Sequence, residues 1–191
     1  MRCNYVKYQD RKLRIIGGNW RGRKITFPEH DDIRPTGDRI RETLFNWLIH
    51  DIRGADCLDL FAGSGVLSIE ALSRGANHVT LIESNEAASS RISNNLAFLD
   101  ASPNSFNNIK SNAMEWLGHC DTSFDLIFID PPFVSNALPS VLELLATRQI
   151  ARKFVYLETP VQLDTNDLPD QWNLYRQKHT GSVHYSLCIT S

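Results

Sequence analysis

The 191-residue sequence predicts an α/β fold with a mostly parallel sheet, and two observations lead to this prediction. From residue 56 onward, short apolar runs alternate with segments of helical periodicity, which is the pattern of repeated β-α units. Near the C-terminus, two β-type runs flank Thr180-Gly181 and predict an antiparallel hairpin at the sheet edge. With 42% hydrophobic residues, a chain of this length can bury one sizeable core.

The N-terminal part of the chain is expected to form a small basic extension. Two β-type runs, at 13–16 and 24–27, lie on either side of Gly17-Gly18 and predict a hairpin. Thr36 is then expected to cap an amphipathic helix, whose apolar residues follow helical spacing at Ile40, Leu44, Trp47 and Leu48. We therefore divide the chain into a basic N-terminal extension, residues 1–53, and a main domain, residues 54–191.

The main domain is read element by element from its apolar runs and caps. Strands are predicted at 57–61, 79–83, 106–110, 126–129 and 154–157, and helices at 66–74, after Asn85, after Asn112 and at 138–145. Right-handed crossovers bring the carboxyl ends of parallel strands to one edge. The stretches "DLFAGSG", "LIES" and "IFIDPPF" all fall at such ends, which predicts a site there.

Charge and cysteine content narrow the possible functions. The net charge is −2, but residues 1–53 carry 12 Lys and Arg against 7 Asp and Glu, and residues 11–24 carry six basic residues and no acidic one. This run is either a solvated surface or a patch for phosphates. The four cysteines have no metal-ligand or CxxC spacing, which disfavours a zinc or redox site and favours a reduced, cytoplasmic protein. No signal peptide or membrane-spanning run is evident.

Gly63-Ser64-Gly65 follows a predicted strand and precedes a predicted helix, where glycines let the backbone approach a ligand closely. It is an incomplete dinucleotide fingerprint, because Ser68 occupies the third glycine position. Glu83, 20 residues after Gly63, can accept both hydroxyls of an adenosine ribose. Asp59 either contacts a ligand or holds the glycine loop. S-Adenosylmethionine, an adenosine ligand without a pyrophosphate, fits this pattern.

Asp130-Pro131-Pro132-Phe133 ends a strand of large apolar residues, "IFIDPPF". Asp and Pro are common turn formers, but the neighbouring glycine loop and Glu83 favour a functional interpretation. The motif is therefore a candidate functional feature at the carboxyl edge of the sheet.

Seven blocks extend this interpretation to the whole chain: "RIIGGNWRGRK", "RPTGDRIRETLFNWL", "LDLFAGSGVLSIEALSRGA", "LIES", "NAMEWL", "IFIDPPF" and "YLET". In this order they resemble the bacterial 16S rRNA guanine-N2 methyltransferases of the RsmD family, over about residues 12–190. The first two blocks are the most specific. The resemblance implies a Rossmann-like class I methyltransferase with a seven-stranded sheet, acting with S-adenosylmethionine, forming S-adenosylhomocysteine and needing no metal.

The resemblance also implies roles for matching residues. The methionine part of the cofactor would lie among Asp59, Phe61, Gly63 and Gly65, the ribose at Glu83, the adenine beside Asn112 and Ala113, and the target base at Asp130, Pro131, Pro132 and Phe133. Phosphates of 16S rRNA, free or within the 30S subunit, would meet Arg14, Arg21, Arg23, Lys24, Arg39 and Arg41. The protein would act as a monomer away from membranes. Asn85 and Ser68 depart from the family pattern, where Asp and Gly are common.

Other interpretations remain open at this stage. The basic residues can serve solubility, and Arg41 can form a helix-surface ion pair. Trp20 either stacks on a base or packs the hairpin, Glu70 and Arg74 are expected to pair along a helix, and Glu158 has no assigned role. N6-adenine methylation of DNA or RNA, a non-catalytic RNA-binding assembly factor and a nicotinamide oxidoreductase are the competing functions, the last disfavoured by Ser68.

Overall fold

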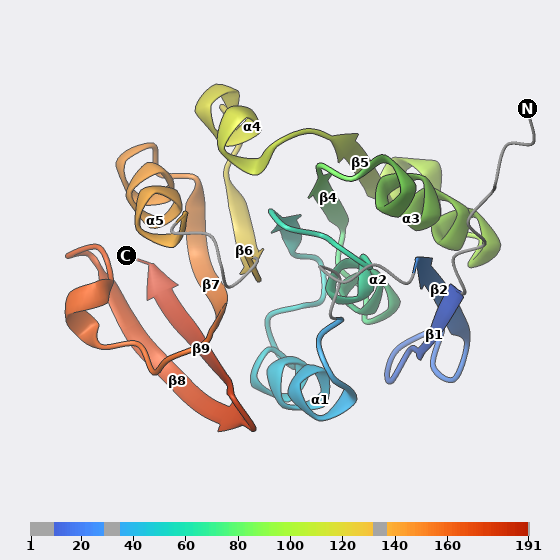
Figure 1. Cartoon of the computed structure of the whole chain (residues 1–191), viewed down its shortest axis with the longest axis horizontal. Helices are drawn as coiled ribbons and strands as arrows, with labels where there is room; N and C mark the ends of the chain where they lie inside the picture. Colours follow the sequence, from blue (N-terminus) through green and yellow to red (C-terminus); the bar gives the residue numbers. More distant parts are fainter. Residues whose placement is uncertain (1–9, 29–34, 132–136, 191) are drawn as a thin grey trace, which may run out of the picture.

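The main feature of the computed structural model is a seven-stranded sheet within the part of the chain that it describes, residues 10–28, 35–131 and 137–190 (Figure 1). The strand order is β5-β4-β3-β6-β7-β9-β8. The bounds are β3 (Asp56–Asp59), β4 (His78–Glu83), β5 (Phe106–Lys110), β6 (Phe124–Ile129), β7 (Ala151–Thr159), β8 (Trp172–Thr180) and β9 (Val183–Thr190). Neighbours from β5 to β7 pair in parallel, whereas β9 is antiparallel to both β7 and β8. The predicted parallel sheet with a terminal hairpin is confirmed.

Helices cover both faces of this sheet. One apolar cluster joins β-strand residues to α1 (Asp38–Trp47), α2 (Val66–Ser73) and α3 (Glu86–Phe98), and a second joins them to α4 (Ala113–His119) and α5 (Leu138–Thr147). Along β6, Leu126 and Phe128 belong to the first cluster, and Ile127 and Ile129 belong to the second. The central strands are continuously apolar because both of their faces are buried. Figure 1 shows α4 and α5 on one side of the sheet and α1 and α2 on the other.

The N-terminal hairpin packs onto α2 and α3. Its strands, β1 (Asp10–Arg14) and β2 (Lys24–Pro28), pair antiparallel. Thr26 and the buried Asn95 of α3 exchange two hydrogen bonds: the Thr26 N–H donates to Oδ1 at 3.1 Å, and the Asn95 amide donates to the Thr26 carbonyl at 2.7 Å. Ile15 and Ile25 join the same apolar cluster as α1–α3. The hairpin therefore shares a core with the main domain, across the predicted boundary at residue 53.

Two of the three predicted helix caps are confirmed. The Asn85 side chain accepts a hydrogen bond from the Ala88 N–H, and the Asn112 side chain accepts from the first turn of α4. The prediction that Thr36 caps α1 is wrong, because the N-cap is Gly37 and has no side-chain hydrogen bond. The Thr36 side chain is buried and directed elsewhere, as described below.

The described elements also include two 3₁₀ turns, η1 (Pro103–Ser105) and η2 (Thr165–Asp167), that the sequence pattern did not predict. Cys57, Cys120 and Cys188 are buried free thiols. Within the described ranges, we find no helix with the length and hydropathy needed to cross a membrane.

Candidate active site

Four carboxyl groups gather at the carboxyl edge of the sheet. They are Asp59, Glu83, Asp130 and Glu158. Asp59 and Glu83 are the last residues of β3 and β4, Asp130 directly follows β6, and Glu158 is the next-to-last residue of β7. Each lies two residues after a member of the apolar cluster on the α1–α3 face, respectively Cys57, Leu81, Phe128 and Tyr156. Since side chains alternate along a strand with period two, all four carboxyl groups are on this face. The three sequence motifs at strand ends thus converge at one edge, as expected.

Glu83 organises the glycine loop between β3 and α2. Its Oε2 accepts a hydrogen bond from the Gly63 N–H at 2.7 Å, and its Oε1 accepts from the Asn85 N–H at 2.6 Å. Gly65, the N-cap of α2, has φ +73°, and a Cβ there would lie 2.9 Å from Cγ1 of Ile92. The turn therefore needs glycine both for its backbone angle and for its contact with α3. Phe61, at the start of this loop, is half-buried.

Asp59 is 2% exposed and accepts a hydrogen bond from the Ser68 hydroxyl of α2 at 2.7 Å. Burial raises the pKa of Asp59 to about 7, and hydrogen bonds from Ser68 and from the backbone of Phe61 oppose that rise. These contacts fit a carboxyl group that holds the glycine loop against α2. They also explain Ser68, which departs from the family pattern but supplies the partner that a buried acid needs.

Asp130 and Glu158 form an adjacent pair, in which Glu158 is buried and Asp130 is half-buried. Phe128 pairs with Tyr156 and Ile129 with Leu157, so the next step of the register places Asp130 beside Glu158. The Tyr156 hydroxyl donates to Oε1 of Glu158 at 2.9 Å.

The Thr36 side chain lies near this pair and lowers the pKa of both carboxyl groups. Burial has the opposite and larger effect and raises the pKa of both acids, and the pKa of Asp130 is raised further by the neighbouring charges of Glu158 and Asp59. Two acids with raised pKa values beside a glycine loop are typical of an active site.

The comparisons with known proteins agree with this geometry. The family model described as "Conserved hypothetical protein 95" matches residues 13–189. "Ribosomal RNA small subunit methyltransferase D" of Escherichia coli K12 is 44% identical over 178 residues, which are 92% of this chain and 89% of that protein. The protein of the same name from Haemophilus influenzae is 38% identical over 180 residues, covering 92% and 93%. A solved structure, "Putative methyltransferase yhhF from Escherichia coli", superposes with a TM-score of 0.84 at 43% identity, covering 94% of this chain and 98% of that one.

This chain belongs to the ribosomal RNA small subunit methyltransferase D family. The predicted family is confirmed, and with it the class I methyltransferase fold, since the sheet order and the terminal hairpin match the expectation. In the described ranges, no group of three or more His, Cys, Asp or Glu side chains is arranged to hold a metal ion.

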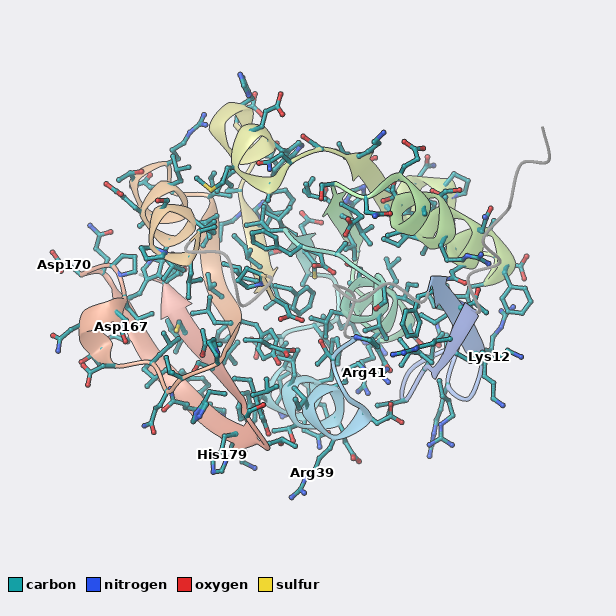
Figure 2. All side chains as sticks on the ribbon, viewed as in Figure 1. Lys12, Arg39, Arg41, Asp167, Asp170 and His179 are labelled. Atoms are coloured by element: carbon teal, nitrogen blue, oxygen red, sulfur yellow. The ribbon has the colours of Figure 1, made fainter. Side chains whose placement is uncertain are left out.

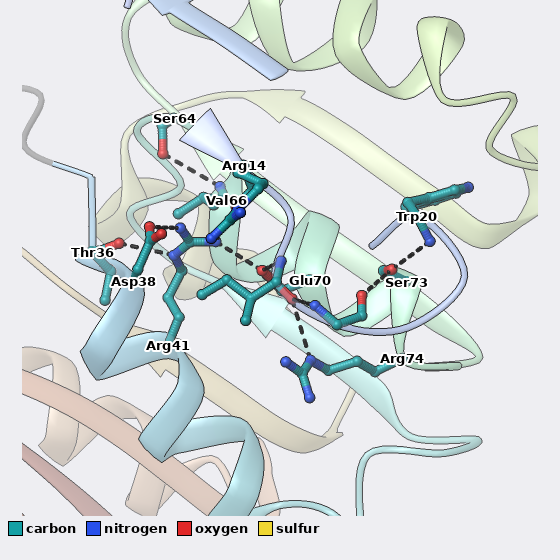
Figure 3. A network of polar contacts seen from close by, with 12 residues as sticks. Arg14, Trp20, Thr36, Asp38, Arg41, Ser64, Val66, Glu70, Ser73 and Arg74 are labelled. Atoms are coloured by element: carbon teal, nitrogen blue, oxygen red, sulfur yellow. Dashed lines mark hydrogen bonds and ion pairs between the residues drawn. The ribbon is translucent and has the colours of Figure 1, made fainter. Parts of the chain in front are cut away.

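For this family member, the prediction that Arg41 contacts RNA is wrong. Arg41 is 0% exposed and its Nη1 donates to Oε1 of Glu70 at 2.8 Å, where Glu70 is also 0% exposed. Figure 3 shows the guanidinium at the centre of a network that ties α1 to α2 and to the hairpin. Its Nε donates to the Thr36 carbonyl at 3.0 Å, and its Nη1 also donates to the Arg14 carbonyl at 3.1 Å. The expected Glu70–Arg74 helix pair is present at 3.2 Å.

The other predicted RNA contacts differ in their availability. Arg14, Arg21, Lys24 and Arg39 are exposed. Figure 2 shows Lys12 and Arg39 extending outward, whereas Arg41 is directed inward. Arg23 is half-buried, donates to the carbonyls of Phe98 and Leu99 at the end of α3, and lies over the Phe98 ring. Arg23 thus anchors the hairpin, and the exposed residues are the ones free to meet phosphates.

The remaining predicted site residues lie as follows. Pro131 is buried directly after β6, while Pro132 and Phe133 lie outside the described residues. Asn112 is exposed at the cap of α4, and Ala113 is buried as the first residue of that helix. Trp20 packs partly buried against the apolar cluster, and its backbone N–H donates to the Ser73 hydroxyl at 2.9 Å, which supports the packing interpretation.

Sequence reasoning missed Thr36, Tyr156 and Glu158 as members of the site. Thr36 looked like a helix cap because it stands two residues before the helix begins. Glu158 carried one signal, since it follows an apolar run in the sequence as Glu83 does, but no spacing rule connected it to Asp130. Strand pairing between β6 and β7 makes that connection.

Proposed function

We propose that this protein transfers a methyl group from S-adenosylmethionine to the exocyclic N2 of a guanine in 16S rRNA of the small ribosomal subunit. The observation that carries the proposal is the position of Asp130 at the same sheet edge as the glycine loop, with Asp59 on the adjacent strand β3. A methyl donor on the loop and an amine held by Asp130 would therefore lie side by side. Membership of the ribosomal RNA small subunit methyltransferase D family supports the RNA substrate.

The cofactor fits the loop and the acids around it. Gly63 and Gly65 let the methionine part approach the backbone, with Phe61 and Asp59 beside it. Glu83 accepts the ribose hydroxyls with the lone pairs that its two backbone contacts leave open. Asn112 and Ala113 lie beside the adenine. The sulfonium carries a positive charge, which favours the ionised forms of neighbouring carboxyl groups.

The chemistry rests on hydrogen-bond acceptors aimed at a poor nucleophile. The lone pair of an exocyclic amine is delocalised into the ring, and acceptors on its N–H groups favour tetrahedral geometry at nitrogen. Asp130 and the Pro131 carbonyl supply these acceptors, and Phe133 stacks on the base. The N–C bond forms as the S–C bond breaks, which leaves S-adenosylhomocysteine, and the nitrogen loses one proton, to Asp130 or through it to water. The target base must leave its stack to reach Asp130 at the sheet edge unless it is already in a loop.

The exposed basic residues supply the RNA contact. Arg14, Arg21, Lys24 and Arg39 carry charge on the hairpin and α1, and phosphate neutralisation there contributes affinity that falls with salt. The substrate is 16S rRNA, free or within the 30S subunit, which places the reaction in the cytoplasm. The protein acts as a monomer in this proposal.

The test is transfer of labelled methyl groups to 16S rRNA, 30S subunits or DNA, followed by identification of the modified nucleoside. We expect N2-methylguanosine. N6-Methyladenine instead would favour the competing methyltransferase function, and cofactor binding without transfer to any substrate would favour an assembly role.

The matched variants are Asp130→Ala and Asp121→Ala, the latter an exposed acid after α4. Asp130→Ala should abolish transfer while cofactor binding, measured by calorimetry, stays intact; Asp121→Ala should change neither. Loss of cofactor binding in Asp130→Ala would show that Asp130 has been given the wrong role.

A further inference from the structure

We propose that Glu158 selects guanine by accepting a hydrogen bond from the N1–H of the target base, while Asp130 accepts from its N2 amine. This inference rests on the proposed function, because it concerns the base held at the same site. It assigns a role to a buried acid that the reaction as described above does not use.

The position of Glu158 is the first argument. It is the next-to-last residue of β7, is 4% exposed, and lies one strand from Asp130 on the same face of the sheet. Side chains at adjacent positions of paired strands lie about 5 Å apart. Two such carboxyl groups can therefore contact neighbouring atoms on one edge of a purine.

The orientation of Glu158 is the second argument. The Tyr156 hydroxyl donates to its Oε1 at 2.9 Å, and the Thr36 side chain lies near both Glu158 and Asp130 and favours their ionised forms. The contact with Tyr156 orients the Glu158 carboxyl group. An ionised carboxylate offers about four lone-pair sites, so these hydroxyl contacts leave acceptor capacity for a ligand.

The chemistry of the base is the third argument. The Watson–Crick edge of guanine presents two adjacent donors, N1–H and the N2 amine, and two adjacent acceptors complement them. Adenine presents its N6 amine beside N1, which is an acceptor and would meet the Glu158 carboxylate lone pair to lone pair. A site built to satisfy a substrate donor rejects an analogue that lacks it, because a buried polar group is then left unpaired.

The ionised form of Glu158 is the one that accepts. Burial raises its pKa, while the hydroxyls of Thr36 and Tyr156 lower it. The sulfonium of bound cofactor adds a positive charge at this sheet edge, which also favours the carboxylate. The acceptor pair is thus complete when the cofactor is in place.

The test uses 2-aminopurine, which keeps the N2 amine of guanine but has a lone pair at N1. The methylated nucleotide is first mapped with the wild-type protein, and 30S particles are then reconstituted with guanine or 2-aminopurine at that position. The wild type should lose about 100-fold in kcat/KM on 2-aminopurine, since a buried acceptor then lacks its donor. In Glu158→Gln, kcat/KM on guanine should fall about 10- to 100-fold. The ratio of kcat/KM on guanine to that on 2-aminopurine should fall at least about 10-fold, because the glutamine amide can donate to N1 of 2-aminopurine.

Controls separate selection from folding and from the proposed function itself. Cofactor affinity should fall only a few-fold in Glu158→Gln, because the lost carboxylate charge lies at the same sheet edge as the sulfonium. Glu143→Gln, at an exposed acid of α5, should match the wild type on both bases. Tyr156→Phe removes one donor that orients Glu158, so it should lower the ratio of kcat/KM on guanine to that on 2-aminopurine by a smaller factor. An unchanged ratio between the bases in Glu158→Gln, with guanine methylated by the wild type, overturns the inference alone; absence of N2-methylguanosine from the wild type overturns the proposed function with it.

Discussion

The buried Arg41–Glu70 ion pair gives the sharpest prediction about stability. Both side chains are 0% exposed, and Glu70 also accepts from the Ile16 N–H at 2.6 Å and from Nε of Arg74 at 3.2 Å. Glu70→Leu would leave the Arg41 guanidinium buried with Asp38, which is 56% exposed, as its remaining charged partner among the residues that the structure describes. Breaking one side of a buried pair costs about 3–5 kcal/mol. Because Asp38 compensates in part, we expect about 3 kcal/mol.

The measurement is a double-mutant cycle of Glu70→Leu and Arg41→Met, in which equilibrium unfolding in urea gives the free energy of unfolding of each variant. Removing both charges at once should cost less than the two single losses combined, with a coupling energy of about 2 kcal/mol or more. The matched control is the exposed pair Glu86–Lys110, whose side chains are 75% and 55% exposed and whose coupling should stay below about 1 kcal/mol. A coupling below about 0.5 kcal/mol at Arg41–Glu70, equal to that of the exposed pair, would refute the reasoning.

Three further predictions concern the glycine loop, the hairpin and its charges. The pKa of Asp59 is raised to about 7, so its contribution to stability is present below its unfolded pKa and is lost as pH rises toward 7. Without cofactor at pH 8, Asp59→Asn should therefore be more stable than the wild type by about 2–4 kcal/mol. Thermal unfolding at a series of pH values should show this difference in stability disappearing at low pH. A Cβ on Gly18 would lie 1.8 Å from a backbone carbonyl of α2, whereas Gly22, with a similar positive φ, has open space. Gly18→Ala should thus lower the unfolding midpoint in urea well beyond Gly22→Ala, which should cost about 1 kcal/mol, and equal losses would contradict the docking of this loop. Removing the charges of exposed Arg21 and Lys24 together should reduce the slope of log affinity against log salt for 16S rRNA by about 1–2, and an unchanged slope would remove the hairpin from the RNA contact.

Much of the fold followed from local patterns in the sequence. The strand at 106–110 and the caps at Asn85 and Asn112 were predicted correctly because they depend on neighbouring residues alone. The glycine loop and Glu83 were also placed correctly relative to each other, since β-α units bring successive strand ends to one edge. Their roles as cofactor contacts stay predictions.

The wrong predictions concern side chains whose partners lie far away in the sequence. Thr36 is a residue type that often caps helices, but its side chain is buried near Asp130 and Glu158. Arg41 was expected on a helix surface, but it pairs with Glu70 on another helix. Neither partner is visible in a local window. Helical periodicity predicts which face of a helix is apolar. Whether an arginine near that face is exposed or buried depends on the residues that pack against it.

The sequence by itself determined the alternation of strands and helices, the glycine turn, the terminal hairpin and the family. These features depend on the spacing of apolar residues, on local composition and on the order of motifs. Only the tertiary structure decided which charges are available to a ligand. It buried Arg41 against Glu70, anchored Arg23 on α3, and set Glu158 beside Asp130 through the pairing of β6 with β7. The physical reason is that burial and pairing fix the cost of a charge, and both depend on contacts between segments that lie far apart in the chain.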